Sequence, residues 1–272
     1  MKKTLLATLI LASLSSAIFA DETIINQASD SRDSSITIRQ SDSDINNAGV
    51  VSTAIVNQLG GVGSNANINQ LDTSAAIAEI SQNGNNQASD IQQRNVSNAH
   101  AITRQTGANN QANINQSQDN TFNSSDIIAE IEQNGQDNIA GIVQSNSTGV
   151  SAILRQNGNG NNSELSQLSV TNSQITVDIT GDNNTTKNFQ ENSSNDINTL
   201  QITGSNNNIT TRQGNADYAS ADNVLNYQAN GNGNTGTISQ FGTGYALDIS
   251  QNGDSGSLNL CQGGSDACDS VN

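Results

Sequence analysis

The sequence predicts an all-β fold, a β-solenoid in which about nine to ten strand-turn-strand coils stack into two facing parallel sheets. Three observations predict it. A unit of 22 to 28 residues recurs along the chain, amide and glycine residues recur at fixed positions within it, and apolar residues alternate with period two on both sides of the glycine. Period two places alternate residues on one face of a strand, and a sustained repeat of this length is typical of solenoids.

One glutamine column marks the repeats at spacings of 23, 23, 28, 23, 23, 23, 27 and 22 residues. Its members are Gln70, Gln93, Gln116, Gln144, Gln167, Gln190, Gln213, Gln240 and Gln262. A second glutamine stands eleven residues earlier at Gln82, Gln105, Gln133, Gln156 and Gln251, and Ile179, Ile202 and Ala229 replace it elsewhere. A degenerate leading copy lies at Ser34–Gln40. Both columns predict that equivalent side chains lie above one another.

A glycine stands nine residues before every marker glutamine and predicts the turn within each coil. These glycines are Gly61, Gly84, Gly107, Gly135, Gly158, Gly181, Gly204, Gly231 and Gly253. Asparagine stands six residues before the marker at Asn110, Asn138, Asn161, Asn184, Asn207 and Asn234. Glycine at a fixed turn position fits a backbone that needs a positive φ. Because the insertions fall between one marker and the next glycine, the strand-turn-strand unit keeps its length.

Stacking explains why glutamine shares an alternation with apolar residues. Ile131 and Gln133 precede the turn, and Ala140, Ile142 and Gln144 follow it on the same alternation. A buried amide without a partner costs about 1–3 kcal/mol. In a stack with about 4.8 Å between coils, however, each amide can donate to the identical group in one neighbouring coil and accept from the other. We therefore expect ladders of buried amides, with aliphatic burial providing the driving force.

The sequence divides into four segments. Residues 1–20 are predicted to be a signal peptide, with basic Lys2 and Lys3, an apolar run at Leu5–Leu14 and cleavage after Ala20. The run is too short and too rich in serine for a membrane anchor. Residues 21–35, with the polar cluster Ser29–Ser35, are predicted to be a flexible leader, residues 36–262 the solenoid and residues 263–272 a C-terminal tail.

Composition and charge exclude several classes of partner. Hydrophobic residues make up 32% of the 272 residues, aromatic residues 3%, and proline and tryptophan are absent. The formal charge is −16 and becomes −18 after loss of Lys2 and Lys3, which argues against nucleic acid and anionic membrane surfaces as partners. In an oxidising compartment Cys261 and Cys268 could form a disulfide; a free pair is the alternative.

The ends of the repeat region favour self-association. The repeat begins near Ile36, is still recognisable at Gln262, and has no proline to block an edge strand. An exposed strand at each end of a solenoid is complementary to the other end, and head-to-tail contacts that do not close produce a filament. The sequence therefore predicts a self-assembling fibre subunit.

The repeat resembles the curlin repeat of bacterial curli subunits. The shared pattern is glutamine, glycine two residues on, asparagine five on, alanine seven on, an apolar residue nine on and glutamine eleven on. Three copies show it closely: "QTGANNQANINQ" (Gln105–Gln116), "QNGQDNIAGIVQ" (Gln133–Gln144) and "QNGNGNNSELSQ" (Gln156–Gln167). Asn188 and Thr211, which replace the aliphatic residue, and the two cysteines depart from the pattern.

This resemblance implies a secreted subunit of a functional amyloid at the bacterial cell surface, a fimbrium that supports adhesion and biofilm formation. It also implies partners: a nucleator subunit, an outer-membrane secretion pore with chaperones, and matrix or host surface molecules. The leader from Asp21 would be the segment that the pore recognises. Both the major and the minor, nucleating subunit fit the resemblance.

Other functions fit the residues less well. The sole histidine, His100, is expected on an outward or loop position, which argues against a histidine-based catalytic triad, and no cofactor or metal is expected. Glu130 and Glu132 share a face assigned to solvent, where charges limit lateral aggregation. The recurring loop of calcium-binding solenoids and the threonine column of ice-binding ones are absent. A capped, soluble β-solenoid that acts as an adhesin or ligand-binding module is the alternative to a fibre subunit.

Overall fold

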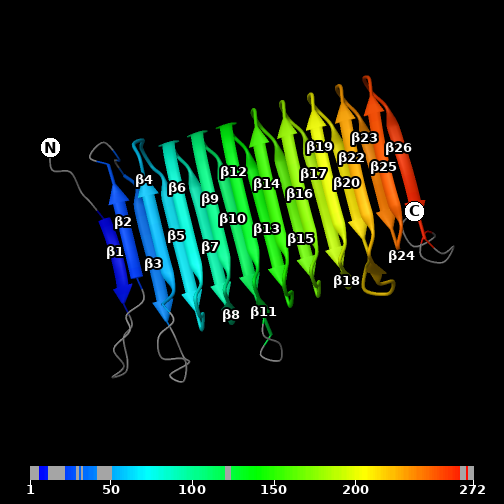
Figure 1. Ribbon diagram of the computed structural model, residues 1–272. Helices are drawn as coiled ribbons and strands as arrows, with labels where there is room; N and C mark the ends of the chain where they lie inside the picture. The colour runs from blue at the N-terminus through cyan, green and yellow to red at the C-terminus, as the bar shows by residue number, and fades with distance from the viewer. Residues whose placement is uncertain are drawn as a thin grey trace.

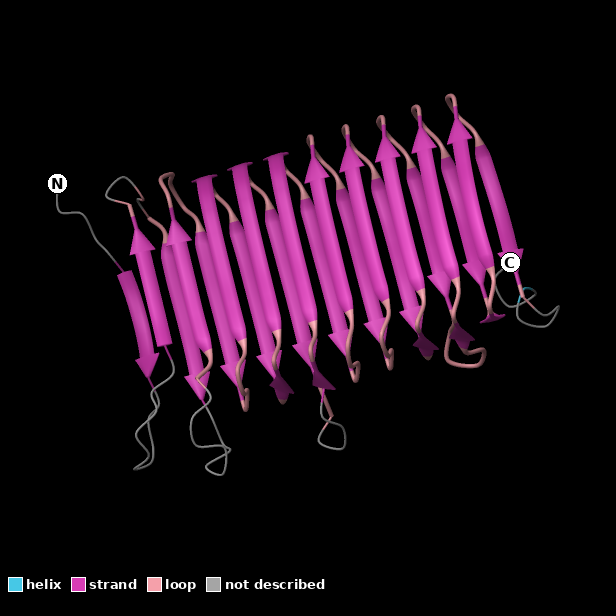
Figure 2. Ribbon diagram, viewed as in Figure 1, coloured by secondary structure: helices cyan, strands magenta, loops and turns pink. Residues whose placement is uncertain are grey.

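A computed structural model of the protein describes residues 6–11, 22–28, 31, 33–41, 51–119, 124–263 and 268. The described chain forms a β-solenoid, which confirms the predicted fold class (Figure 1). Sheet A has 11 strands, sheet B has 10, and neighbouring strands within each sheet are parallel. Figure 2 shows short turns joining the two layers on both sides of the stack. Among the described residues, no helix is long and apolar enough to cross a membrane.

Each coil contributes one strand to each sheet. Sheet B contains β2 (Glu22–Gln27), β4 (Thr53–Gln58), β6 (Ile77–Asn85), β9 (His100–Ala108), β12 (Ile128–Gln136), β14 (Ser151–Asn157), β16 (Gln174–Thr180), β19 (Ile197–Thr203), β22 (Val224–Asn230) and β25 (Ala246–Asn252). Sheet A contains β1 (Leu6–Leu11), β3 (Ser35–Ser41), β5 (Asn65–Leu71), β7 (Ala88–Arg94), β10 (Gln111–Ser117), β13 (Ile139–Ser145), β15 (Asn162–Leu168), β17 (Thr185–Glu191), β20 (Asn208–Gln213), β23 (Thr235–Gln240) and β26 (Ser257–Gln262). Short strands in the connections between coils form two small ladders: β8 (Val96–Ser97) with β11 (Ser124–Ser125), and β18 (Ser193–Ser194) with β21 (Ser220–Ala221) and β24 (Gly242–Thr243).

The strand register matches the sequence columns. Gln144 of β13 lies opposite Gln116 on one side and Gln167 on the other. In sheet B, Gly135 lies opposite Gly107. A shift of one residue would move every amide and aliphatic side chain of a strand to the opposite face. The repeated columns therefore specify a single register.

The core lies between the two sheets and follows the predicted alternation. In β13, Ala140, Ile142 and Gln144 are buried and alternate with more exposed residues. The aliphatic column is fully buried at Ile68, Ile91, Ile114, Ile142, Leu165 and Ile238, and its last member, Leu260, is half-buried. A second, smaller apolar cluster fills the connections between coils, with members Ala76, Val96, Ala99, Ile127, Val150 and Val170. The sequence columns did not predict this second cluster.

The later coils carry polar side chains within the main core. Asn188 and Thr211, which replace the aliphatic residue, are fully buried. The Thr211 hydroxyl donates to Asn188 Oδ1 at 2.7 Å, and Asn198 Nδ2 of the facing sheet donates to Thr211 Oγ1 at 2.7 Å. The departures from the repeat therefore occur together and partly satisfy one another across the two sheets.

The N-terminal part differs from the prediction. Within the expected flexible leader, residues 21–35, Glu22–Gln27 forms β2 and pairs in register with β4, so the solenoid begins one strand earlier than predicted. Within the expected signal peptide, Leu6–Leu11 forms β1 along β3. The predicted cleavage position after Ala20 lies outside the described residues, and so does Ser29 of the predicted polar cluster. Removal of residues 1–20 stays a prediction.

Candidate functional site

The candidate functional site is a set of amide ladders that run the length of the solenoid and end at its two rims. The long ladder consists of Gln40, Gln70, Gln93, Gln116, Gln144, Gln167, Gln190, Gln213, Gln240 and Gln262. In each step the Nε2 of one glutamine donates to the Oε1 of the next, at 2.8 to 3.3 Å. The interior members are fully buried, whereas Gln40 and Gln262 are half-buried. Stacking therefore satisfies the interior amides, whereas the end members Gln40 and Gln262 each have an amide partner on one side only.

The short ladder runs through the first part of sheet B. Its members are Gln27, Gln58, Gln82, Gln105, Gln133 and Gln156, with donor-acceptor distances of 2.9 to 3.1 Å. Register confirms that Ile179, Ile202 and Ala229 continue the same column without an amide. Gln27 and Gln58 were not predicted, because irregular loop lengths hide their spacing from Gln82.

Hydroxyl groups satisfy the amides where this column is interrupted. Gln156 Nε2, which faces Ile179, donates to Ser163 Oγ at 2.9 Å. After the gap, Gln251 Oε1 accepts a hydrogen bond from the Tyr227 hydroxyl. Burial raises the pKa of Tyr227 to about 12, so this hydroxyl keeps its proton at neutral pH. These two hydroxyl groups cap the ends of the interrupted ladder, and the glutamine spacing does not predict either of them.

The glutamine ladders have a direction. In every amide-to-amide step the Nε2 donates toward the C-terminal end, and most of these amides also donate to a backbone carbonyl of the facing sheet. Gln190 shows the pattern: its Nε2 donates to Gln213 Oε1 at 2.9 Å and to the Gln174 carbonyl oxygen at 3.0 Å. A reversed amide would place Oε1 against that carbonyl oxygen, so the backbone fixes the orientation. The C-terminal end of the long ladder therefore presents an amide donor at Gln262, and its N-terminal end presents an amide acceptor at Gln40.

The asparagine column ties each coil to the turns of its neighbours. All six predicted asparagines are fully buried or nearly so. Asn161 is representative: its Nδ2 donates to Asn138 Oδ1 at 3.1 Å and to the Gly181 carbonyl oxygen of the next coil at 2.8 Å. Its backbone N–H also donates to Asn138 Oδ1, at 3.0 Å. In the first coils Ser64 and Gln87 take this position, and each donates to the glycine carbonyl oxygen of the next coil. The asparagine spacing did not predict them.

The nine turn glycines all have positive φ, between 100° and 137°, as predicted. Stacking imposes a second requirement. A Cβ at Gly135 would lie 1.9 Å from the carbonyl oxygen of Gly158, and one at Gly158 would lie 2.0 Å from that of Gly181. The positive φ therefore favours glycine at all nine positions, and close stacking adds a steric restriction at every one except Gly253.

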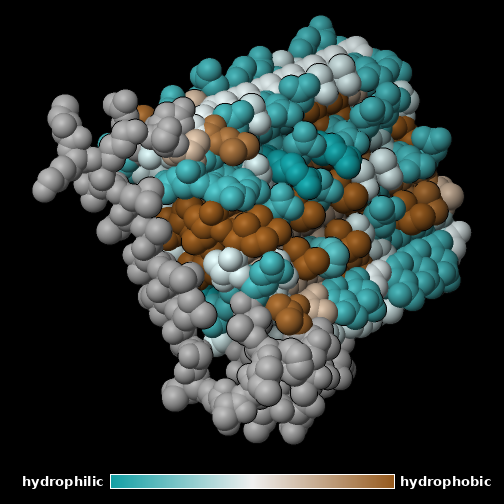
Figure 3. Space-filling view, turned by 60° about the vertical axis from the view of Figure 1, so that its left-hand side comes forward, coloured by the Kyte–Doolittle hydropathy of each residue, from teal (hydrophilic) through white to brown (hydrophobic). Residues whose placement is uncertain are grey.

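The two rims expose the ends of the same columns. At the C-terminal rim Leu247, Ile249 and Leu258 are partly buried and pack against the core, and at the N-terminal rim Ile25 does so. In Figure 3, which turns the N-terminal end forward, brown apolar surface lies between teal polar bands. Apolar side chains flanked by open amides are what an interior coil presents to its neighbour. The C-terminal rim, and the N-terminal coil formed by β2 and β3, are thus shaped to receive another coil.

The other predicted polar residues lie on the outer faces. His100 is exposed at the start of β9. Glu130 pairs with Arg104 at 2.5 Å, and Glu132 lies 4.0 Å from Arg155. These ion pairs connect neighbouring coils along the outer face of sheet B. Across the described ranges, no group of three or more His, Cys, Asp or Glu side chains could hold a metal ion.

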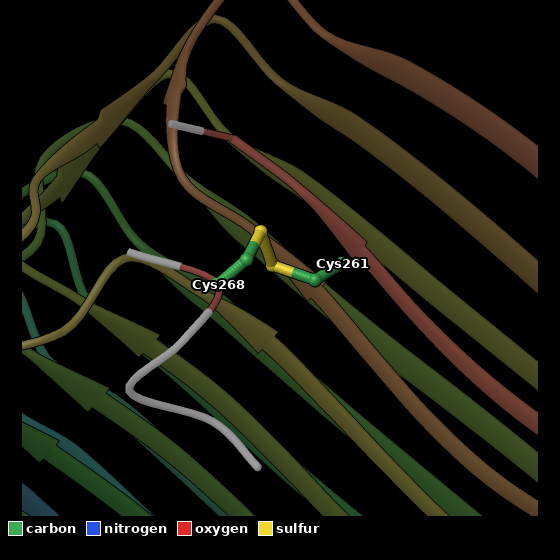
Figure 4. The surroundings of a disulfide bond; sticks show 2 residues. All are labelled: Cys261 and Cys268. Atoms are coloured by element: carbon green, nitrogen blue, oxygen red, sulfur yellow. A yellow bond between two sulfur atoms is a disulfide. The ribbon is translucent and has the colours of Figure 1, made fainter. Parts of the chain in front are cut away.

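Cys261 and Cys268 form a disulfide, which decides between the two alternatives (Figure 4). Their Cα atoms are 5.6 Å apart. Cys261 belongs to β26, the last strand of sheet A, and continues the column of Ser239 in the preceding strand. The disulfide therefore attaches Cys268, in the predicted tail, to the terminal coil.

Asp196 is a fully buried carboxylate that sequence reasoning did not single out. It lies in the connection between two coils, where Oδ1 accepts the backbone N–H of Asn223 at 2.8 Å and Oδ2 accepts from the Ser220 hydroxyl. Burial raises its pKa above the ordinary 3.8 and neighbouring Asp222 adds to the shift, while the hydrogen bonds oppose it. The charged form is thus disfavoured in the folded chain.

Replacing Asp196 with asparagine should stabilise the protein at neutral pH by about 1–3 kcal/mol, because a neutral amide keeps the acceptor for Asn223 and avoids a buried charge. The pKa of Asp196 is higher in the folded state than in the unfolded state. Lowering the pH from above the folded-state pKa toward 3.8 therefore protonates the folded protein first and stabilises the native sequence. The advantage of Asp196→Asn should therefore shrink as the pH falls. Urea unfolding of both proteins at about pH 7 and about pH 4 measures it; an equal difference at both values would contradict this explanation.

A scan of protein-family models finds no match to this chain, and a search of curated proteins finds none either. The chain is therefore understood from its own repeat and geometry: a parallel β-solenoid, typical of repeat surface or structural proteins, with directional amide ladders and unlike ends.

Proposed function

We propose that the protein is the structural subunit of an extracellular, curli-like amyloid fimbrium that assembles head to tail and supports adhesion and biofilm formation. The observation that carries the proposal is the direction of the long ladder. Gln262 at one rim offers a donor, and Gln40 at the other is an acceptor in the same column. A second molecule placed on a rim in register would continue both sheets and the ladder.

The apolar columns support the same arrangement. Continuing the register would place Leu258 of one molecule over Ile36 of the next, and Ile249 over Ile25. Burying such side chains contributes about 1.5–3 kcal/mol for each large one. Contacts between unlike ends do not close, so they extend a filament rather than form a dimer.

The resemblance to curlin repeats supports the rest of the proposal: secretion to the bacterial cell surface after removal of residues 1–20, with a nucleator, an outer-membrane pore and chaperones as partners. The proposed role is non-catalytic, because the repeated positions of the site carry neutral amides, glycines and aliphatic side chains. The acidic charge keeps free subunits apart before assembly.

Purified residues 21–272 should form fibres that bind thioflavin and give a meridional reflection at about 4.7–4.8 Å. Incubation at increasing concentration, with electron microscopy and fibre diffraction, measures this. A chain that stays monodisperse for days at high concentration would instead favour the capped solenoid that acts as an adhesin or ligand-binding module.

A further inference from the structure

The N-terminal rim is uneven because sheet A extends one strand beyond sheet B. Sheet A ends at β1, and sheet B ends at β2. β1 pairs in parallel with β3 over six residue pairs, from Leu6 opposite Ser35 to Leu11 opposite Gln40 (Figure 1). The edge of β3, the strand that bears the first glutamine of the long ladder, is thus already occupied by the protein's own chain.

The register of β1 breaks the long ladder. Leu11 occupies the column position in which every following coil has glutamine. Leucine has no amide to donate to Gln40. Gln40 Oε1 instead accepts a hydrogen bond from the Thr23 hydroxyl of the facing sheet, at 2.6 Å. This hydrogen bond does not involve β1, and an amide oxygen can accept two, so Gln40 Oε1 can accept a second donor once β1 is removed.

An occupied β3 edge is incompatible with the docking of a second copy in register. Such docking requires β25 on β2 and β26 on β3 at the same time. With β1 in place, an incoming molecule meets β1 one strand early, which would leave β2 and β25 about two strand spacings, or about 9.6 Å, apart. The backbone groups of both strands would stay unpaired, and the donor of Gln262 would face Leu11.

We propose that residues 6–11 block the docking edge on β3, and that their removal converts a non-assembling chain into one that accepts the β26 edge of a second copy. This inference rests on the proposed head-to-tail assembly. It adds a reason for the order of events: the same cut that removes the N-terminal segment exposes the strand and the glutamine acceptor that assembly uses.

The test uses the full chain with a specific protease site inserted between Ala20 and Asp21, so that one preparation is compared before and after cleavage. Fibre seeds made from cleaved protein are added, and elongation is followed by thioflavin fluorescence. Cleavage should raise the elongation rate at least about tenfold. A tenfold change corresponds to a free energy of about 1.4 kcal/mol for the pairing of β1 with β3. The matched control carries a scrambled site and receives the same protease.

A second variant removes the block without cleavage. Leu9→Pro with Ile10→Pro takes away two neighbouring backbone N–H groups of β1, so it should release β1 and let the uncleaved chain elongate seeds. Hydrogen exchange at Ile36–Gln40 should become faster in monomers of this variant than in monomers of the parent chain. Equal elongation rates before and after cleavage would overturn the inference while leaving head-to-tail assembly intact. Cleaved protein that cannot elongate would overturn both.

Discussion

Gly135→Ala will lower the free energy of unfolding by about 4 kcal/mol, near the top of the range for single substitutions. Gly135 has a φ of 128°, which L residues rarely adopt, and an added Cβ would lie 1.9 Å from the carbonyl oxygen of Gly158. The clash lies between two stacked coils and cannot be relieved by rotating a side chain. Urea unfolding monitored by circular dichroism measures the change.

Gly141→Ala is the matched control. Gly141 lies only six residues further on, in β13, and a Cβ there would have no heavy atom within 4 Å. Because glycine within a strand is less favourable than alanine, this variant should keep the stability of the parent or gain about 0.5–1 kcal/mol. Similar losses in both variants would show that stacking at the turn does not restrict Gly135.

Gln144→Ala will cost about 2–4 kcal/mol of stability, because one buried N–H and one buried amide oxygen lose their hydrogen bonds at about 1–2 kcal/mol each. Gln116 Nε2 loses Gln144 Oε1 as an acceptor, and Gln167 Oε1 loses Gln144 Nε2 as its donor. Apolar burial does not compensate, since alanine also leaves a cavity. Thermal and urea unfolding measure the loss.

Gln111→Ala provides the comparison for the ladder. Gln111 lies on β10 but is exposed, so its replacement should change stability by less than about 0.5 kcal/mol. If Gln144→Ala were as mild as Gln111→Ala, the buried ladder would contribute nothing measurable to folding.

The repeated columns were sufficient to predict the architecture. Because the glycine column and both glutamine columns keep one spacing within the coil, parallel in-register stacking was the arrangement that satisfied the amides. The conformation of the turn glycines and the burial of residues such as Gln144 and Asn138 followed from the same pattern. These features depend on position within one coil, which a single sequence shows directly.

Features that depend on contacts between columns could not be predicted. The caps on Gln156 and Gln251 use Ser163 and Tyr227 of other columns, so spacing gives no sign of them. Strand β2 was missed because the loops around it have irregular lengths. The direction of the ladders was also hidden, since it depends on backbone carbonyls of the facing sheet.

The most direct test of the central claim is an electron cryo-microscopy structure of fibres grown from residues 21–272. We predict that both parallel sheets continue through the junction between molecules, with Gln262 of one subunit donating to Gln40 of the next. Fibres that join like ends, or that turn the glutamine columns toward water, would contradict it.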